Sequence, residues 1–408
     1  MTDTSRRLLV TGALLCLAPV GAVHAENITP DFTVNGYATA AFARLSGNEG
    51  ATYPKNTNNG MPVIIGQPTT EADTLGGLQF RYRLNDQAAF VMQEVAQSFN
   101  DPSQQYTEQN NYSLRTDWLY MDYRFNDDLT LRAGRFAFST YLYSENMKVG
   151  EAYPWVRLPQ EIYSQLGGLN NNSGVELLYK HSFGDWNLLL QPNYTSEQLN
   201  GFAVNNATQL AATLSNDSLT LHLGTGTSPI NIEQPGLVQM LQTAAGAPAG
   251  TPFGDQIAAS INLQHDRAVF NEAGFLFDDG KWFAAGEATS LRVKGWFPDH
   301  NASYLSVGHY VGKWLPYAMY STYKTTNNYQ LAMSLPAPIA AALGPSQKYQ
   351  QATASLGARY QFKPNMSLKM EADRISDFNN TSGLFNLPPS NPQLKTVYLY
   401  SLGMTAAF

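Results

Sequence analysis

Five charged side chains lie within one aromatic-rich stretch of the sequence, residues 136–173. They are Glu145, Lys148, Glu151, Arg157 and Glu161. The stretch has no sustained period of 2 or 3.6, and a long irregular segment inside a compact domain usually has a functional role. Two charges about 4 Å apart interact by roughly 4 kcal/mol at an effective dielectric near 20. The five groups could therefore create a field that orients a polar solute, or could pair with other charges to hold the stretch in place.

The same stretch contains four tyrosines and a tryptophan, Tyr141, Tyr143, Tyr153, Trp155 and Tyr163. Exposed rings of this kind could offer stacking surfaces to sugars or aromatic solutes. Aromatic residues in a loop more often pack it against a neighbouring wall, and we favour this second interpretation.

Catalytic and metal-binding patterns are poorly represented. The histidines after residue 25 are His181, His222, His265, His300 and His309. None has the i,i+4 or Cys/His spacing of a metal site, and no G-x-S-x-G or phosphate-binding loop stands out. A lipid-acting enzyme would need a serine, a histidine and an acid brought together by the fold, which spacing alone leaves open. We expect neither an enzyme nor a bound cofactor or metal.

The first 25 residues have the features of a secretory signal peptide. A positive start precedes an apolar run over residues 8–20, and residues 23–25 form a small-x-small cleavage site. Such a run is too short to span a membrane as a helix. We predict that residues 1–25 are removed and that residues 26–408 form a single domain. Because Cys16 is the only cysteine of the chain, the predicted mature protein has neither disulfides nor thiol chemistry.

The composition limits the class of protein further. With a net charge of −7, the chain is a poor candidate for nucleic-acid binding. Only 14% of its residues are charged, against roughly 25% in an ordinary soluble domain. After the first 25 residues no apolar run is long enough for a transmembrane helix. If the protein lies in a membrane, it must be a closed barrel, because no other structure satisfies its backbone groups without helices.

Alternation with a period of 2 indicates strands with one apolar and one polar face. In residues 77–84 the apolar side chains have even numbers and the arginines odd numbers. In residues 119–125 the apolar side chains have odd numbers, and in residues 129–134 the apolar and basic positions again differ in parity. This assigns four arginines to the polar faces of strands: Arg81, Arg83, Arg124 and Arg132.

Short turns and long connections alternate along the chain. Residues suited to tight hairpins recur at 85–86, 126–127, 184–185, 216–217, 278–280, 311–312 and 363–365. Long polar connections lie near 44–74, 98–113, 137–172, 195–207, 227–264, 293–301, 325–349 and 377–393. This pattern predicts about sixteen antiparallel strands. The number would be fourteen or eighteen if the weakly patterned segment near 207–226 were assigned wrongly. Residues 235–245 and 335–343 are expected to form short helices within two of the long connections.

The last strand has the most specific local pattern. The residues that share one face of the segment 396–408 are Tyr398, Tyr400, Leu402, Met404, Ala406 and Phe408. A C-terminal phenylalanine after alternating apolar residues resembles the terminal strand of Gram-negative outer-membrane proteins, which the barrel-assembly machinery recognises.

With these features the chain resembles the sixteen-stranded outer-membrane porins. The resemblance covers residues 32–408 in architecture and rests on Phe408, the seven short turns and the third long connection. In that family the third loop follows the fifth strand, folds inside the barrel and forms the constriction. Gly134-Arg135, at the end of the expected fifth strand, is similar to the Gly-Arg often found there. The segment 152–157 differs from the acidic loop of the best-known general porins, which indicates a less characterised branch.

The resemblance implies an all-β transmembrane antiparallel barrel in the outer membrane of a Gram-negative cell, with short periplasmic turns and long extracellular loops. Residues 136–173 would be the constriction loop, and its charged side chains would face a wall of arginines: Arg81, Arg83, Arg124, Arg132 and Arg135. Strict alternation points Arg135 outward unless a bulge at Gly134 turns it inward.

The function that the resemblance implies is passive diffusion of small hydrophilic solutes. A substrate-specific or gated channel is the alternative, and a lipid-acting enzyme or an adhesin is less favoured. The expected partners are outer-membrane lipid and lipopolysaccharide, the barrel-assembly machinery through the strand that ends at Phe408, and further copies of the chain in a homotrimer.

Overall fold

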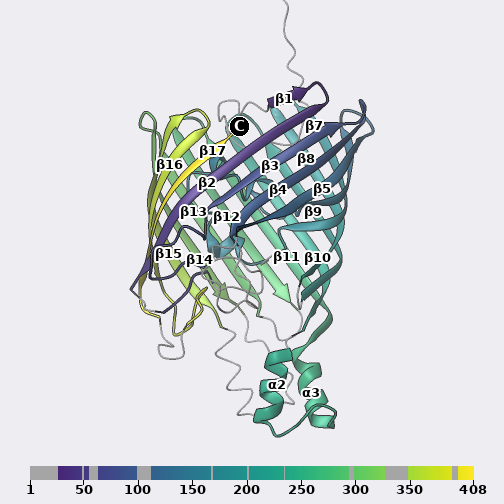
Figure 1. The fold of residues 1–408 in the computed structure, drawn as a ribbon, viewed down its shortest axis with the longest axis vertical. Coiled ribbons are helices and arrows are strands. Elements are labelled where there is room, and N and C mark those ends of the chain that lie inside the picture. The colour runs from purple at the N-terminus through teal and green to yellow at the C-terminus, as the bar shows by residue number, and fades with distance from the viewer. Residues whose placement is uncertain are drawn as a thin grey trace, which may run out of the picture.

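The computed structural model describes residues 26–47, 50–54, 63–98, 112–166, 169–199, 202–233, 235–293, 298–326, 348–387 and 394–408. The predicted signal peptide and the expected helix at 335–343 lie outside the described residues. Figure 1 shows the chain wound into a barrel, with the C-terminus and the short strand β1 (Glu26–Thr29) at the same end.

Sixteen strands close into one antiparallel barrel, and β1 adds a short pairing to β2. The barrel strands are β2 (Phe32–Ser46), β3 (Leu75–Arg83), β4 (Ala88–Ser98), β5 (Tyr112–Arg124), β6 (Leu129–Ala137), β7 (Asn171–Phe183), β8 (Trp186–Leu199), β9 (Phe202–Ser215), β10 (Leu219–Ile232), β11 (Leu263–Asp278), β12 (Trp282–Val293), β13 (His300–His309), β14 (Trp314–Thr325), β15 (Gln350–Lys363), β16 (Met366–Ser376) and β17 (Val397–Ala407). Each pairs with the next strand along the chain, and β17 closes the barrel on β2. The prediction of a sixteen-stranded all-β barrel is confirmed.

All seven predicted short turns join neighbouring strands. In three of them an asparagine supplies the turn, because its Oδ1 accepts the backbone N–H groups of the second and third residues that follow. These asparagines are Asn85, Asn126 and Asn216. This side-chain-to-backbone bonding makes asparagine common in tight hairpins.

One predicted long connection is wrong. The segment 195–207 is mostly strand, because β8 continues to Leu199 and β9 begins at Phe202. A β-bulge at Thr195/Glu197 and a positive φ of 54° at Asn206 accommodate the polar residues that interrupt the hydrophobic alternation, so the strands continue through this segment. The weakly patterned segment near 207–226 likewise forms parts of two full strands.

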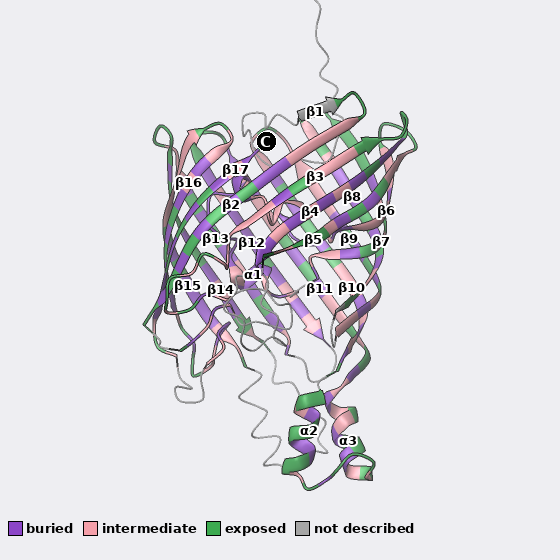
Figure 2. Cartoon of the chain, in the orientation of Figure 1, coloured by how far each residue is buried: buried purple, intermediate pink, exposed green. Residues whose placement is uncertain are grey.

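The two faces of β17 illustrate how side chains alternate around the barrel (Figure 2). Its outer face exposes Tyr398, Tyr400, Leu402 and Met404. Its inner face buries Val397, Leu399, Ser401 and Thr405. Exposed apolar side chains in such numbers would be unfavourable in water and are favourable in hydrocarbon. The outer surface is therefore suited to a lipid bilayer.

Two further helices lie outside the barrel wall. The predicted helix at 235–245 is confirmed as α2 (Pro235–Ala244), and α3 (Pro252–Ile261) follows it. Figure 1 shows both projecting from the end of the barrel opposite the C-terminus. Among the described residues, no helix is both long and apolar enough to cross a membrane.

The hydrophobic core lies inside the barrel. The connection between β6 and β7, residues 138–170, folds into the lumen and is called the inner loop below. It is slightly shorter than the predicted 136–173, because the first two and last three of those residues belong to the flanking strands. Its aromatic residues join buried side chains from several strands, among them β11, β12, β13, β14 and β17, in the largest cluster of buried hydrophobic residues. The predicted inward-folded third loop is therefore present.

Candidate functional site

The inner loop leaves the barrel wall near a glycine and returns beside its starting point. Gly134 has a positive φ of 134°, a backbone conformation that favours glycine. The backbone N–H of Phe138 donates to the carbonyl of Asn170 at 2.9 Å, so the two ends of the loop meet. Between them lie the short helices η1 (Ser144–Asn146), η2 (Gly150–Ala152) and α1 (Gln160–Tyr163).

The aromatic residues of the inner loop pack against one another and against the wall. Trp155 and Tyr143 are fully buried, with ring centroids 5.8 Å apart in an edge-on arrangement. The indole N–H of Trp155 donates to Ser306 Oγ on β13 at 3.0 Å, and its ring lies 5.4 Å from that of Tyr304. None of the five aromatic residues singled out in the sequence is more than 7% exposed. They anchor the loop, and little of their surface is open to solvent.

Glu161 fixes the end of the inner loop to β14 and β15. Its carboxylate accepts hydrogen bonds from Ser321 Oγ at 2.9 Å, Gln351 Nε2 at 2.6 Å and Thr353 Oγ1 at 2.5 Å. Glu161 is only 2% exposed. A buried carboxylate without a cation needs several donors, and the three wall side chains supply them.

Arg157 connects the inner loop to three carboxylates. Its Nη2 donates to Asp73 Oδ2 and to Ser401 Oγ, both at 2.7 Å. Its Nη1 lies 3.8 Å from Glu371 Oε1 and 3.7 Å from Asp373 Oδ2 on β16. Burial by itself would lower the pKa of Arg157, but Asp73 and the two β16 carboxylates outweigh it and raise that pKa. The guanidinium is therefore a permanent charge at this position.

Lys369 on β16 binds the backbone of the inner loop. Its side chain is fully buried, and its Nζ donates to the carbonyl oxygens of Gly150, Tyr153 (2.6 Å) and Trp155 (2.9 Å). The ammonium also lies 4.7 Å from the centroid of the Tyr153 ring. An ammonium has three N–H donors, so the three carbonyls satisfy it fully.

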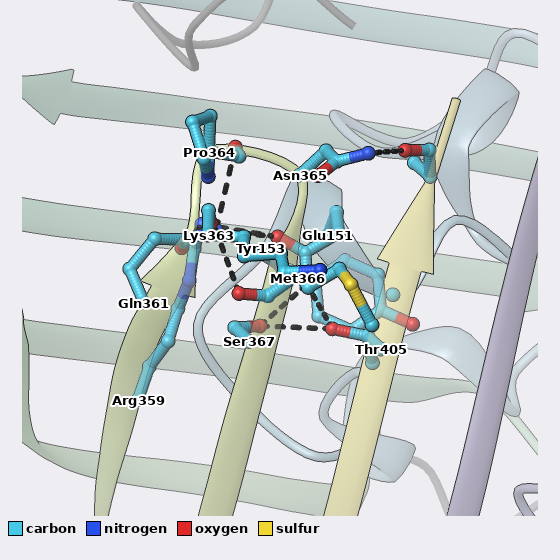
Figure 3. Close-up of polar contacts among 12 residues, drawn as sticks. Glu151, Tyr153, Arg359, Gln361, Lys363, Pro364, Asn365, Met366, Ser367 and Thr405 are labelled. Atoms are coloured by element: carbon cyan, nitrogen blue, oxygen red, sulfur yellow. Dashed lines mark hydrogen bonds and ion pairs between the residues drawn. The ribbon is translucent and has the colours of Figure 1, made fainter.

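Glu151 fixes the middle of the inner loop to the last strands (Figure 3). Its carboxylate accepts hydrogen bonds from Ser367 Oγ at 2.5 Å, Gln361 Nε2 at 3.1 Å and Thr405 Oγ1, and lies 3.4 Å from Arg359 Nη2. Burial would raise the pKa of Glu151, but the Arg359 charge and these hydrogen bonds outweigh it and lower the pKa below its usual value. The carboxylate is thus ionised at neutral pH.

The opposite wall holds the inner loop through a cluster of charges around Arg132 on β6. The guanidinium contacts Asp122 at 3.3 Å, Glu145 of the loop at 3.2 Å and Glu176 at 3.0 Å. It also lies 4.4 Å from the centroid of the Tyr120 ring. Arg132 is buried, so three carboxylates and an aromatic face replace its water.

Lys148 adds a second contact on this side, where its Nζ lies 2.5 Å from Asp117 Oδ2. The remaining wall meets the start of the loop. Gln209 on β9 donates to Thr140 Oγ1 at 2.8 Å, and Glu287 on β12 accepts the backbone N–H of Leu142 at 3.1 Å. The inner loop therefore contacts the wall on all sides and spans the lumen.

The five charges singled out in the inner loop are thus brought to three different parts of the wall. Each is paired with a wall partner and none forms an open row of charge. This arrangement matches the interpretation in which the charges hold the loop in place.

Of the other arginines assigned to the wall, only Arg81 lies beside the charges around Arg132. Arg81 contacts Asp122 at 3.2 Å. Arg83 pairs with Asp31 at 2.7 Å, where both side chains are about half exposed. Arg124 donates to the carbonyl of Asp86 in a short turn at 2.8 Å. The last two therefore lie at the short-turn end of the barrel.

Arg135 requires a correction. The strand register continues without a bulge through Gly134 and pairs Arg135 with Leu119. Residues paired directly across an antiparallel ladder share a face, and Leu119 is exposed on the outer wall. Arg135 therefore lies on the outer face, where it pairs with Glu197 at 2.6 Å, and it is not part of the pore wall.

Several partners of the inner loop were not identified from the sequence. The most informative are Lys369, Glu371 and Asp373, which alternate with apolar neighbours along β16 and so share one face. The alternation of polar and apolar residues along β16 could have identified this face from the sequence. Nothing in the neighbouring sequence marks Asp73 or Asp117 as partners of the loop. Within the described residues, no group of three or more histidine, cysteine, aspartate or glutamate side chains could hold a metal ion.

Comparison with known proteins identifies the fold. No family model and no curated protein sequence matches the chain. Among solved structures, it is similar to OmpF of Salmonella typhi in complex with daunomycin, with a TM-score of 0.55, 13% identity, and coverage of 92% of this chain and 97% of that chain. It is similar to an anion-selective porin from Comamonas acidovorans, with a TM-score of 0.53, 10% identity, and coverage of 93% and 100%.

A third similar structure is the trimer form of OmpT, an outer membrane protein of Vibrio cholerae, with a TM-score of 0.52, 11% identity, and coverage of 93% and 100%. Identities this low show a shared fold. Together with the closed barrel, these similarities show that the chain has the fold of the outer-membrane porins.

Proposed function

We propose that this protein is an outer-membrane channel for small hydrophilic solutes, closed at rest by its inner loop, which must shift for solutes to pass. The observation that carries the proposal is the contact of the inner loop with the wall on all sides. This supports the gated alternative over a permanently open diffusion pore.

The chemistry of the wall beneath the inner loop supports a channel rather than a solid structural core. The buried inward side chains of β13 to β17 include Ser306, Ser321, Gln351, Thr353 and Thr405. If the loop moves, water can replace the hydrogen bonds that these polar groups make with it, so the cost of exposing them is modest. Polar side chains around water are what a hydrophilic solute needs along its path.

Planar-bilayer recordings of the full-length protein under a salt gradient test the proposal. We expect a low resting conductance with brief openings. The matched variant replaces residues 139–169 by a short glycine–serine linker, which can join Phe138 to Asn170 because their backbones already meet at 2.9 Å. This variant should conduct continuously, and its reversal potential would give the ion preference.

Two results would contradict the proposal. A steady, large conductance in the unmodified protein would mean that the loop does not close the lumen. An absence of current from both proteins, each shown to be folded by the heat-dependent shift of its band on a denaturing gel, would mean that the barrel is not a channel.

We also propose that the channel is a homotrimer, because the similar OmpT structure is described as a trimer form. Sedimentation of the detergent-solubilised protein tests this, and a monomeric mass would refute it. Lipid and lipopolysaccharide around the apolar wall, and the barrel-assembly machinery at the strand that ends at Phe408, remain the expected partners.

A further inference from the structure

A cavity of about 450 Å³ lies between the inner loop and the short-turn end of the barrel. The loop segment Ala152–Pro154 covers it on one side. The other side reaches the turns that carry Gly280, Lys313 and Lys363. This volume is within the roughly 300–1,000 Å³ typical of sites for small molecules. The cavity thus reaches the short-turn end, which is periplasmic in an outer-membrane barrel.

One part of the cavity is apolar and aromatic. Its lining includes Leu276, Phe283 and Leu315 from the wall and Tyr153 with Pro154 from the inner loop. The first four are buried side chains at fixed positions, so a ligand would find a surface that is already formed. Flat apolar surfaces of this kind favour a ring over a flexible chain, because a ring loses less conformational freedom on binding.

The other part of the cavity is cationic. Arg359, Lys313 and Lys363 line it, and the two lysines are exposed near the turns. The acidic groups beside them are Asp278, which accepts the Tyr310 hydroxyl at 2.8 Å, and Glu151 of the inner loop. Three basic and two acidic groups leave an excess of one positive charge, which one carboxylate would neutralise.

The guanidinium of Arg359 is only partly satisfied by its neighbours. Its Nη2 contacts Glu151 at the long distance of 3.4 Å and also donates to Gln361, while its buried Nε has no hydrogen-bond partner (Figure 3). A guanidinium presents five N–H donors and binds carboxylates through two of them at once. A ligand carboxylate in the cavity would give a second anionic partner to a guanidinium that Glu151 contacts only at long range.

We propose that this cavity binds a small aromatic carboxylate from the periplasmic side. The ring would lie against Phe283, Leu315 and Tyr153, and the carboxylate would face Arg359 and the two lysines. The proposal does not depend on whether the barrel conducts, because the site is an equilibrium binding site that the closed structure already contains.

Isothermal titration of the detergent-solubilised full chain with benzoate tests the proposal, with detergent alone as the blank. We expect saturable binding to one site per chain. Benzamide has the ring without the charge, and hexanoate has the charge on a flexible, lipid-like chain. Both should bind at least tenfold more weakly than benzoate. Equal binding of benzamide would refute the role of the positive charge, and equal binding of hexanoate would refute the preference for a ring.

Arg359→Gln should weaken benzoate binding at least tenfold while retaining a donor for Glu151. Arg374→Gln, an exposed arginine on β16, is the matched control and should leave binding unchanged. If Arg359→Gln does not fold, Lys313→Gln with Lys363→Gln changes only exposed turn residues and should weaken binding severalfold. Unchanged affinity in a folded cavity variant, or no saturable binding by the unmodified protein, would overturn the proposal.

Discussion

The contact between Lys369 and the inner loop gives the most direct test of how the barrel is closed. Lys369→Met keeps the length of the side chain and removes its three donors. The carbonyl groups of Gly150, Tyr153 and Trp155 then lose their wall partner. The contacts of the loop with the other walls are unchanged, so the substitution weakens closure without removing the loop.

The expected magnitude follows from the three hydrogen bonds. A buried acceptor left without a donor costs about 1–3 kcal/mol. We take the low end, because methionine also removes the cost of burying an ammonium. Three carbonyls at about 1 kcal/mol each give about 3 kcal/mol, and every 1.4 kcal/mol is a factor of ten. The population with a released loop should therefore rise roughly a hundredfold.

Thiol labelling measures this population directly. Ala285 on β12 is fully buried on the inner face, so Ala285→Cys in a Cys16→Ser background should react with a membrane-impermeant maleimide only when the loop is released. Lys369→Met should raise the labelling rate roughly a hundredfold and the frequency of channel openings to match. Lys324→Met removes an exposed lysine and is the matched control.

An unchanged labelling rate in folded Lys369→Met protein would refute the reasoning, because it would mean that the three carbonyl contacts do not hold the loop. A rise of the same size in Lys324→Met would also refute it, since loss of charge alone would then explain the effect.

Three further predictions concern other contacts of the inner loop. The pKa of Glu151 is lowered in the folded protein, so the stabilisation of the closed loop by this carboxylate is present above the ordinary carboxyl pKa and is lost as the pH falls below about 4. Channel openings should therefore become more frequent in acid. The Glu151→Gln variant should show a smaller increase. Arg132→Met leaves three carboxylates without their cation and should lower the free energy of unfolding in urea by about 3–5 kcal/mol, whereas Arg374→Met, at an exposed position, should change it little. Gly150→Ala places a Cβ 2.6 Å from a methyl group of β17. This overlap should destabilise the closed position of the loop by about 1–3 kcal/mol and increase the rate of thiol labelling about tenfold. Gly236→Ala, which has open space around it, should leave the rate unchanged.

The barrel itself could be predicted because its determinants are local. Asparagine at residues 85, 126 and 216 forms the turn with backbone groups two and three residues away. The period of 2 follows from strand geometry, in which successive side chains point to opposite faces. Strict alternation also predicted correctly that Arg135 points outward, whereas resemblance to a family suggested an inward side chain. Alternation did not identify the strands within 195–207, because a β-bulge there allows polar residues to remain in the ladder.

The path of the inner loop across the lumen could not be predicted in this way. Glu161 finds its donors on Gln351 and Thr353, and Glu151 finds one on Thr405. These partners are far away in the sequence, and their approach depends on how the inner loop folds within the barrel. The same charged residues could form an open constriction or a closed plug with equal local preference.

The sequence by itself therefore determined the antiparallel barrel and its short turns, because turns and face alternation are fixed by neighbouring residues, whereas the resemblance to porins supplied the inward fold of the third loop. Only the tertiary structure decided that the loop spans the lumen and that a cavity with a net positive charge remains beneath it. The physical reason is that burial makes each charge depend on partners from opposite walls, and closure of the barrel is what brings those walls to the loop.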